Sequence, residues 1–174
     1  MYKLRELEKK DMSVVNSWRN DPELISSLGA PFRFINQDVD DKWFDSYMAS
    51  RSTTVRCAIV TKHDDTILGL VSITSINQLN QSGMLHIMIG EKDNRGKGMG
   101  YYAVSEMIKH AFFNLNLRRI ELDVLATNIA AQKLYEKCGF VKEGIRRKAV
   151  YKNGAFVDMY IYAILREELG DESK

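Results

Sequence analysis

Residues 94–100 read Asn-Arg-Gly-Lys-Gly-Met-Gly, so glycines alternate with cations between an apolar run and an expected helix. Glycine adopts backbone angles that side chains forbid, which lets consecutive N–H groups converge on one anion. The first turn of the following helix offers further free N–H groups, and its dipole favours negative charge at the same place. Arg95 and Lys97 add positive charge. The spacing predicts a phosphate or pyrophosphate site. A flexible basic turn is the simpler alternative, because a glycine motif alone is a weak signal.

Two nucleotide-binding motifs that contain these glycines fail on their context. Residues 98–103 fit G-x-G-x-x-A, and Glu121 and Asp123 follow about 20 residues on, where a ribose-binding acid belongs. That motif places its first glycine directly after a strand, whereas a charged run, residues 91–97, intervenes here. A P-loop needs Ser or Thr after its Gly-Lys pair to hold magnesium, and Gly98 stands there instead. We therefore expect neither a dinucleotide fold nor a P-loop.

The composition is that of an ordinary globular domain. The 174 residues are 45% hydrophobic and 28% charged, which is enough to bury a sizeable core. We expect one domain over residues 1–168 and a frayed tail at 169–174. The net charge of +2, with basic residues scattered among acidic ones, argues against a nucleic-acid partner. No apolar run reaches the roughly 20 residues that span a bilayer, which argues against a membrane partner.

The N-terminal residues, the cysteines and the histidines indicate the cellular compartment and whether a metal site is present. Residues 1–6 mix both charges, unlike a signal peptide. Cys57 and Cys138 fall in apolar segments without paired spacing, so we expect reduced structural thiols in a cytoplasmic protein. We predict no metal site, because no metal-ligand spacing joins the three histidines His63, His86 and His110.

Hydrophobic periodicity predicts a mixed sheet. Alternating or continuous apolar runs indicate strands at residues 2–8, 54–61, 67–76, 84–89, 120–124, 140–151 and 156–165. Helical spacing indicates helices at residues 11–20, 37–49, 99–113 and 128–137. We expect Asp11 to cap the first helix, Gly139 to end the last one in a left-handed conformation, and Asn153-Gly154 to turn a hairpin. This order predicts a mixed α/β or α+β sheet with helices on both faces.

Three segments in this order resemble the GNAT superfamily of N-acetyltransferases, over essentially the whole chain. Residues 95–100 fit its acetyl-CoA loop, Gln/Arg-x-x-Gly-x-Gly/Ala. Residues 127–140 are similar to its segment that runs from an asparagine through a tyrosine to Gly-Phe. Residues 115–122, with Glu143-Gly144 and the ending 164–168, resemble the RimJ/RimL-like branch, which includes spermidine acetyltransferases. The resemblance implies the GNAT fold, a single domain with a mostly antiparallel sheet of about seven strands, a splayed fourth and fifth strand, and helices on both faces.

The resemblance also implies acetyl-CoA as the co-substrate, with no metal. The pyrophosphate of CoA is then expected on the backbone N–H groups of Arg95, Gly96, Lys97, Gly98, Met99 and Gly100. The pantetheine arm is expected to lie between the splayed strands like an added strand. Backbone groups of Ile87, Met88 and Ile89 would bind its amide and the thioester oxygen, and the side chain of Asn128 would contact the arm.

Tyr135 is the strongest candidate for a catalytic side chain. It follows Asn128 by two helical turns, so both residues project from one side of the short helix. By the resemblance, this tyrosine protonates the departing thiolate of CoA. The alternative is an aromatic ring that packs on Phe140.

The general base is less clear, because Met84 stands where many members of this branch carry a glutamate. A thioether cannot accept a proton. His86 lies two residues on, hence on the same face of the strand, and its ordinary pKa is near 6.5. The alternatives are that His86 only packs or lies on the surface, and that water removes the proton or the amine arrives neutral.

The predicted function is acetyl transfer from acetyl-CoA to a primary amine, of a protein N-terminus or a small molecule, by direct attack in a ternary complex. A polyamine or amino-sugar acetyltransferase and a catalytically silent acyl-CoA-binding module are the alternatives. Acceptor specificity is expected from residues 24–36 and 148–156. Four aspartates near the start of the second predicted helix have two interpretations: Asp38, Asp40, Asp41 and Asp45. They could present an acidic face to a polyamine, or they could be helix caps and part of a solvated face.

A homodimer is a further prediction. Branch members often associate, and the last strand is rich in tyrosine, with Tyr160 and Tyr162. Tyrosine is common at interfaces. The alternative is that these rings only cover the core.

Overall fold

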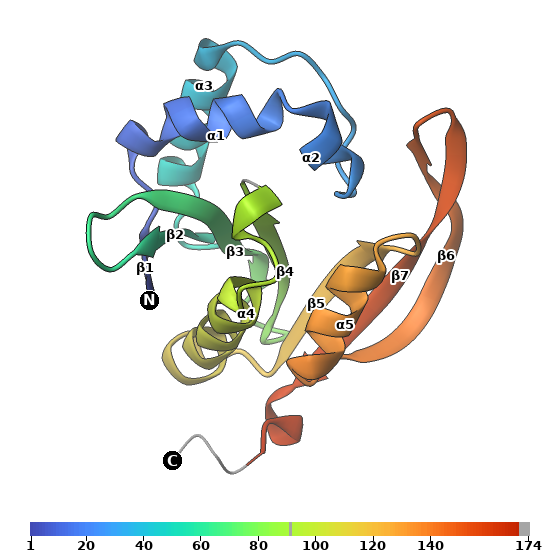
Figure 1. The fold of residues 1–174 in the computed structure, drawn as a ribbon. Coiled ribbons are helices and arrows are strands. Elements are labelled where there is room, and N and C mark those ends of the chain that lie inside the picture. Colours follow the sequence, from blue (N-terminus) through green and yellow to red (C-terminus); the bar gives the residue numbers. More distant parts are fainter. Residues whose placement is uncertain (91, 171–174) are drawn as a thin grey trace.

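Seven strands form one sheet in the order β1-β2-β3-β4-β5-β7-β6 (Figure 1). The computed structural model describes residues 1–90 and 92–170. Neighbouring strands are antiparallel except β4 and β5, which run parallel. The strands are β1 Tyr2–Glu6, β2 Val55–Thr61, β3 Ile67–Asn77, β4 Ser82–Ile89, β5 Arg119–Leu125, β6 Val141–Lys152 and β7 Ala155–Leu165.

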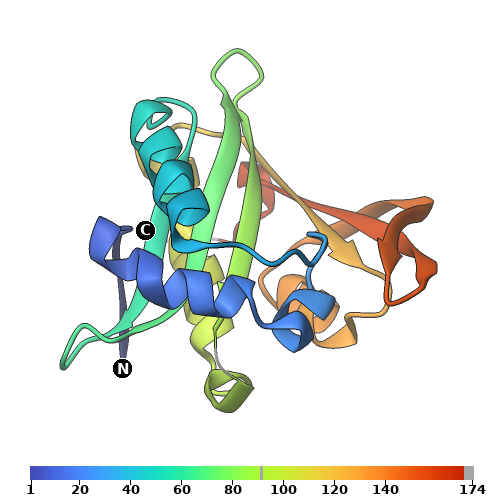
Figure 2. The same cartoon turned by 90° about the horizontal axis from the view of Figure 1, so that it is seen from above.

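Helices cover both faces of this sheet. One face carries α1 Met12–Arg19, α2 Pro22–Ser26 and α3 Gln37–Ala49, and the other carries α4 Met99–Lys109 and α5 Ile129–Lys137 (Figures 1 and 2). Because strand side chains alternate between faces, the middle of β2 serves two cores. Ile59 packs into the core that contains α4, whereas Ala58 and Val60 pack with α1 and α3. All three side chains are fully buried.

The parallel pair β4–β5 is short, and a gap opens between the two strands beyond it. Ser82, Gly83 and Met84 pair with Arg119, Ile120 and Glu121, after which the two strands diverge. Beyond Met84, β4 stays paired with β3 on its other side, as far as Ile89 opposite Gly69. The β4 edge that faces β5 therefore keeps unpaired backbone groups along the gap. This confirms the splayed fourth and fifth strands and the mixed sheet.

The predicted strands and helices are confirmed to within a few residues, with one helix missed. The helix predicted at residues 11–20 ends as α1 at Arg19, and Asp21-Pro22, a pair that commonly ends a helix, also starts α2. The Asp21 carboxylate accepts hydrogen bonds from the N–H groups of Glu23 and Leu24, and proline is tolerated in a first turn because it needs no donor there. The segment between the first two predicted helices thus contains a third.

One other local prediction is wrong, and one predicted helix changes its type near its end. Asp11 does not cap α1 with its side chain, because its carboxylate accepts hydrogen bonds from Arg5 and from the N–H of Glu8. The helix predicted at 99–113 ends as α4 at Lys109, and a π-helical turn, His110–Asn114, continues it. Gly139, at φ 94°, ends α5 as expected. Asn153 and Gly154, at φ 49° and 85°, make the expected hairpin turn.

The chain end and the last strand also differ from expectation. Leu169 packs against the larger core, so the frayed tail does not begin there, and residues 171–174 of that prediction lie outside the described residues. Tyr162 is only 1% exposed, and its hydroxyl donates to Glu136. Tyr160 is partly buried beneath the ammonium of Lys142. Tyr160 and Tyr162 therefore cover the core, which is the alternative interpretation of these two rings.

Candidate active site

Two cavities meet in the gap between β4 and β5. The first, which we call the strand cavity, has a volume of about 500 Å³ and lies between β4, β5, β2 and the segment after α2. The second, the loop cavity, has a volume of about 400 Å³ and lies against the glycine-rich loop and α5. Both are lined by Ser27, Leu28, Ile87, Asn128, Ala131 and Tyr135. A ligand in one cavity can therefore reach a ligand in the other past Tyr135.

The glycine-rich loop has the conformation that an anion site needs. Gly96 and Gly98 have φ of 74° and 81°, in the left-handed region that favours glycine. Gly98 is the N-cap of α4, and neither glycine has protein atoms within 4 Å of where a Cβ would lie. The start of α4 thus opens into free space, where its N–H groups and dipole favour an anion. The loop fits a pyrophosphate group.

Only some of the residues predicted to bind CoA line the two cavities. Arg95, Gly96, Gly98 and Gly100 line the loop cavity. Lys97 is exposed and does not line it. The Met99 side chain is 1% exposed within the larger core, so only its backbone is available. On β4, Ile87 lines both cavities, Met88 the strand cavity and Ile89 the loop cavity.

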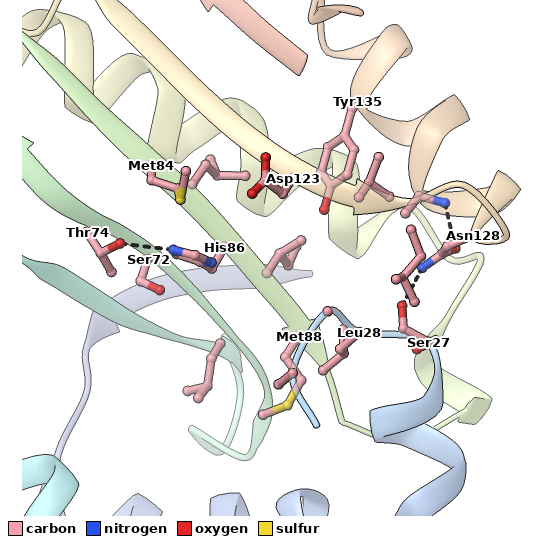
Figure 3. A pocket seen from close by; sticks show the side chains of 18 of the residues that line it. Ser27, Leu28, Ser72, Thr74, Met84, His86, Met88, Asp123, Asn128 and Tyr135 are labelled. Carbon is pink, nitrogen blue, oxygen red and sulfur yellow. Dashed lines mark hydrogen bonds between the residues drawn. The ribbon is translucent and has the colours of Figure 1, made fainter. Parts of the chain in front are cut away.

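Tyr135 combines a packed ring with a free hydroxyl. Its ring lies 5.9 Å from that of Phe140 in an edge-on arrangement, and the side chain is 7% exposed. The hydroxyl points into the strand cavity (Figure 3) and has no hydrogen-bond partner among the described residues. Burial, with a smaller contribution from Cys138, raises the pKa of Tyr135 to about 12. The group is therefore a protonated hydroxyl at neutral pH.

His86 lies across the strand cavity from Tyr135 (Figure 3). Its Nε2 is 2.9 Å from the hydroxyl oxygen of Thr74 on β3, and this contact fixes the ring. The ring reaches solvent through the open cavity, yet the protein packed around it disfavours charge. Desolvation, assisted by Arg56 and opposed by Asp123, lowers the pKa of His86 below 6.5. His86 is thus a neutral imidazole at neutral pH and can accept a proton.

Asp123 is a site residue that the sequence interpretation considered only as part of a rejected dinucleotide motif. Met84 pairs with Glu121, and one step of two residues along each strand places His86 and Asp123 on the same face. One carboxylate oxygen, Oδ2, accepts a hydrogen bond from Arg146. The other, Oδ1, is buried and has no partner in the described part of the chain. The period-two pattern of β5, with Ile120, Leu122 and Val124 in the core, was the available signal.

Asn128 lines both cavities, but its amide already serves the fold. Its Oδ1 accepts from the N–H of Ala131 and caps α5, and its Nδ2 donates to the carbonyl of Ser27 at 2.9 Å. The buried ammonium of Lys152 donates to the carbonyls of Ile25 and Ala30. These bonds hold the segment after α2 over the site. Met84 also lines the strand cavity and brings no acid–base group.

The acidic residues of α3 do not form the face that a polyamine would need. Asp40 is fully buried, where it pairs with Arg19 and accepts from Asn16. Asp41 accepts from Gln37, and none of the four α3 aspartates lines the strand cavity. The alternative of a solvated face applies to the aspartates that are not buried. The alternative of a helix cap does not apply, because Asn36 is the residue that caps α3.

Over residues 1–90 and 92–170, no cluster of three or more His, Cys, Asp or Glu side chains could hold a metal ion. No helix in the same ranges is long and apolar enough to cross a membrane.

Comparisons with known proteins agree with this arrangement. The family model of the acetyltransferase (GNAT) domain matches residues 2–141. An N-acetyltransferase from Bacillus licheniformis is 29% identical over 95% of this chain and 93% of its own length. The spermidine N(1)-acetyltransferase of Vibrio cholerae is 27% identical over 98% and 96%. The crystal structure of spermidine N-acetyltransferase from Vibrio cholerae, in complex with CoA and spermine, superposes with a TM-score of 0.89 at 26% identity over 96% of both chains. The chain belongs to the GNAT acetyltransferase family and is an acetyl-CoA-dependent N-acetyltransferase.

Proposed function

We propose that the protein acetylates a primary amine that enters the strand cavity, with Tyr135 as general acid and His86 as general base. The observation that carries this proposal is the free, protonated hydroxyl of Tyr135 at the junction of the two cavities. Arg95, Gly96, Gly98 and Gly100 would hold the pyrophosphate of CoA, together with the backbone of Lys97 and Met99. The unpaired β4 edge at Ile87, Met88 and Ile89, with Asn128, would hold the pantetheine arm.

The residues divide the proton transfers between them. Acetyl-CoA supplies the acetyl group as a thioester, whose C–S bond breaks as the amine nitrogen forms the new C–N bond. His86 accepts the proton that the amine nitrogen releases, directly or through one water. Tyr135 donates its hydroxyl proton to the thiolate sulfur and recovers a proton from solvent. The products are the acetamide and the free thiol of CoA.

Asp123 is suited to bind the acceptor as an ammonium ion. A buried carboxylate oxygen without a partner costs free energy, and a cationic amine would satisfy it. The polyamine alternative is favoured by the similarity to a spermidine acetyltransferase that binds spermine. Among the described residues that line the strand cavity, however, Asp123 alone is acidic.

A panel of amines tests the proposal. Purified protein with acetyl-CoA is given peptide N-termini, amino sugars, polyamines and simple alkylamines, and released thiol is measured. We expect thiol release that depends on the amine, with the acetamide identified by mass spectrometry. Amine-independent hydrolysis alone would contradict acetyl transfer through the strand cavity.

The general base gives a pH prediction. Because the pKa of His86 lies below 6.5, the histidine is neutral above that pH, and kcat/KM should fall as pH drops through the lowered pKa. His86→Gln keeps a hydrogen-bonding group for Thr74 but cannot take the proton. We expect this acidic limb to disappear from the pH–rate profile and the rate at neutral pH to fall roughly 10²-fold. His63→Gln, in the turn between β2 and β3, should leave the limb unchanged. An identical limb in His86→Gln would assign it to another group.

We also propose a cytoplasmic homodimer. Two observations support it. Cys57 and Cys138 are both free thiols, which supports the cytoplasmic location. Tyr151 and Phe156 at the β6–β7 hairpin are 60% and 64% exposed, and their rings lie edge-on with centres 5.2 Å apart, which supports an interface there. A mass of twice 20.0 kDa by light scattering is expected, and a monomer mass at micromolar concentration would exclude the dimer.

A further inference from the structure

The guanidinium of Arg56, on β2, lines the strand cavity without an anionic partner. Its Nε is buried and makes no hydrogen bond. Its Nη1 reaches only the hydroxyl of Ser72, at 3.5 Å, and no described carboxylate forms an ion pair with it. Arg56 has no role in the proton transfers or in the CoA binding proposed above.

Aromatic rings fix this guanidinium in place. Its central carbon lies 4.5 Å from the ring centre of Trp43 on α3 and 5.9 Å from that of Tyr47. Stacking on these rings preorganises the planar fork of donors that binds carboxylate or phosphate oxygens.

The carboxylates bonded to the neighbours of Arg56 are already engaged elsewhere. Glu6 accepts hydrogen bonds from Arg51 and from Tyr47, and Asp40 pairs with Arg19. Neither can neutralise Arg56 without breaking an existing pair. Burial lowers the pKa of Arg56, but arginine stays protonated at any working pH. The protein therefore keeps a partly desolvated cation in the cavity wall, and an anion that arrives there gains more than it would in water.

The strand cavity carries opposite charges on its two walls. His86 lies between them in the sheet, because Arg56 on β2 pairs with Ser72 on β3, Ser72 pairs with His86 on β4, and Asp123 follows on β5. A polyamine would satisfy Asp123 with one ammonium group but would bring its others towards Arg56. A molecule with one amine and one anionic group would satisfy both walls.

We infer that the acceptor carries a carboxylate or phosphate group besides its amine, and that Arg56, held against Trp43, binds this group. The inference rests on the proposed role of the strand cavity as the acceptor site. It names the substrate class that the cavity selects, namely small anionic amines.

Matched pairs of amines test the subsite. Wild-type protein is assayed with ethanolamine and phosphoethanolamine, with propylamine and β-alanine, with glucosamine and its phosphate ester, and with spermidine. In at least one pair we expect kcat/KM for the anionic member to be higher by about tenfold or more. Arg56→Met should remove that preference through KM, leave kcat within about threefold, and leave the uncharged member unchanged. Arg56→Lys should restore part of it, because the charge returns without the fork.

A control variant and the contrary results distinguish failure of the anion subsite from failure of the proposed acetyl transfer. Arg118→Gln removes an equal charge from the surface, where Arg118 pairs with Glu167, and should not alter the preference. The inference is overturned if wild type prefers spermidine or the uncharged members, or if Arg56→Met slows both members of a pair equally. If no amine is acetylated, the proposed function fails, and calorimetry of the CoA-bound protein with the anionic amines decides on the subsite. Binding that Arg56→Met abolishes supports the subsite, and equal or absent binding in both proteins refutes it.

Discussion

Tyr135→Phe is expected to lower kcat by roughly 10²–10⁴-fold, the usual size of a lost acid–base contribution. The substitution keeps the ring that packs edge-on against Phe140 and removes only the hydroxyl. Because that hydroxyl has no hydrogen-bond partner among the described residues and points into the cavity (Figure 3), its loss leaves no other group unsatisfied, and the fold should persist. The thiolate of CoA must then leave without a proton from the enzyme. Steady-state kinetics, with acetyl-CoA affinity measured separately by calorimetry, should show a changed kcat at constant affinity.

Tyr2→Phe is the matched control, since this tyrosine lies on the edge strand β1 and lines neither cavity. It should retain kcat within about threefold, because it removes a hydroxyl far from the site and keeps the ring. A Tyr135→Phe protein that also stays within about threefold of wild type would make Tyr135 a packing residue. Positioning by the loop and by β4 would then have to supply most of the rate.

Gly98→Val is expected to weaken acetyl-CoA binding about 100-fold, because valine does not adopt the φ of 81° that caps α4. Loss of this conformation turns away the N–H groups that face the pyrophosphate. At a ligand concentration of 100 times the wild-type Kd, acetyl-CoA stabilises wild type by about 2.7 kcal/mol and the variant by only about 0.4 kcal/mol. The corresponding rise in melting temperature is about 5–10 °C for wild type and about 1–2 °C for the variant. Thermal unfolding with and without acetyl-CoA measures both.

Gly154→Val provides the control for backbone strain. Gly154 has φ of 85° and, like Gly98, no protein atom within 4 Å of its Cβ position, but it lies at the tip of the β6–β7 hairpin. This variant should be destabilised by a comparable amount and keep the full acetyl-CoA shift. A full rise in melting temperature with acetyl-CoA in Gly98→Val would show that the loop does not bind CoA. A comparable rise with NADH in wild type would support a dinucleotide site there.

Local signals predicted most of the elements. The hairpin at Asn153-Gly154 and the left-handed end of α5 at Gly139 depend on backbone angles that few residues adopt, so the sequence alone identifies them. Alternation placed β5 for a similar reason, since only one of its faces enters the larger core. The start of α2 was missed, because Asp21-Pro22 is equally compatible with the end of one helix and the start of the next.

The sequence alone determined the anion loop and the candidate acid Tyr135, because their motifs are contiguous in the chain. The acceptor side was decided only by tertiary structure. Arg56 and Asp123 are far apart in sequence, and their charges face one cavity because β4 and β5 diverge after Met84. Asp40, which the sequence offered as part of an acidic face, is buried by its pairing with Arg19. Long-range contacts decide which charged atoms keep no partner among the described residues, and an acceptor in the cavity meets the guanidinium of Arg56 and the free Oδ1 of Asp123, whose Oδ2 is bonded to Arg146.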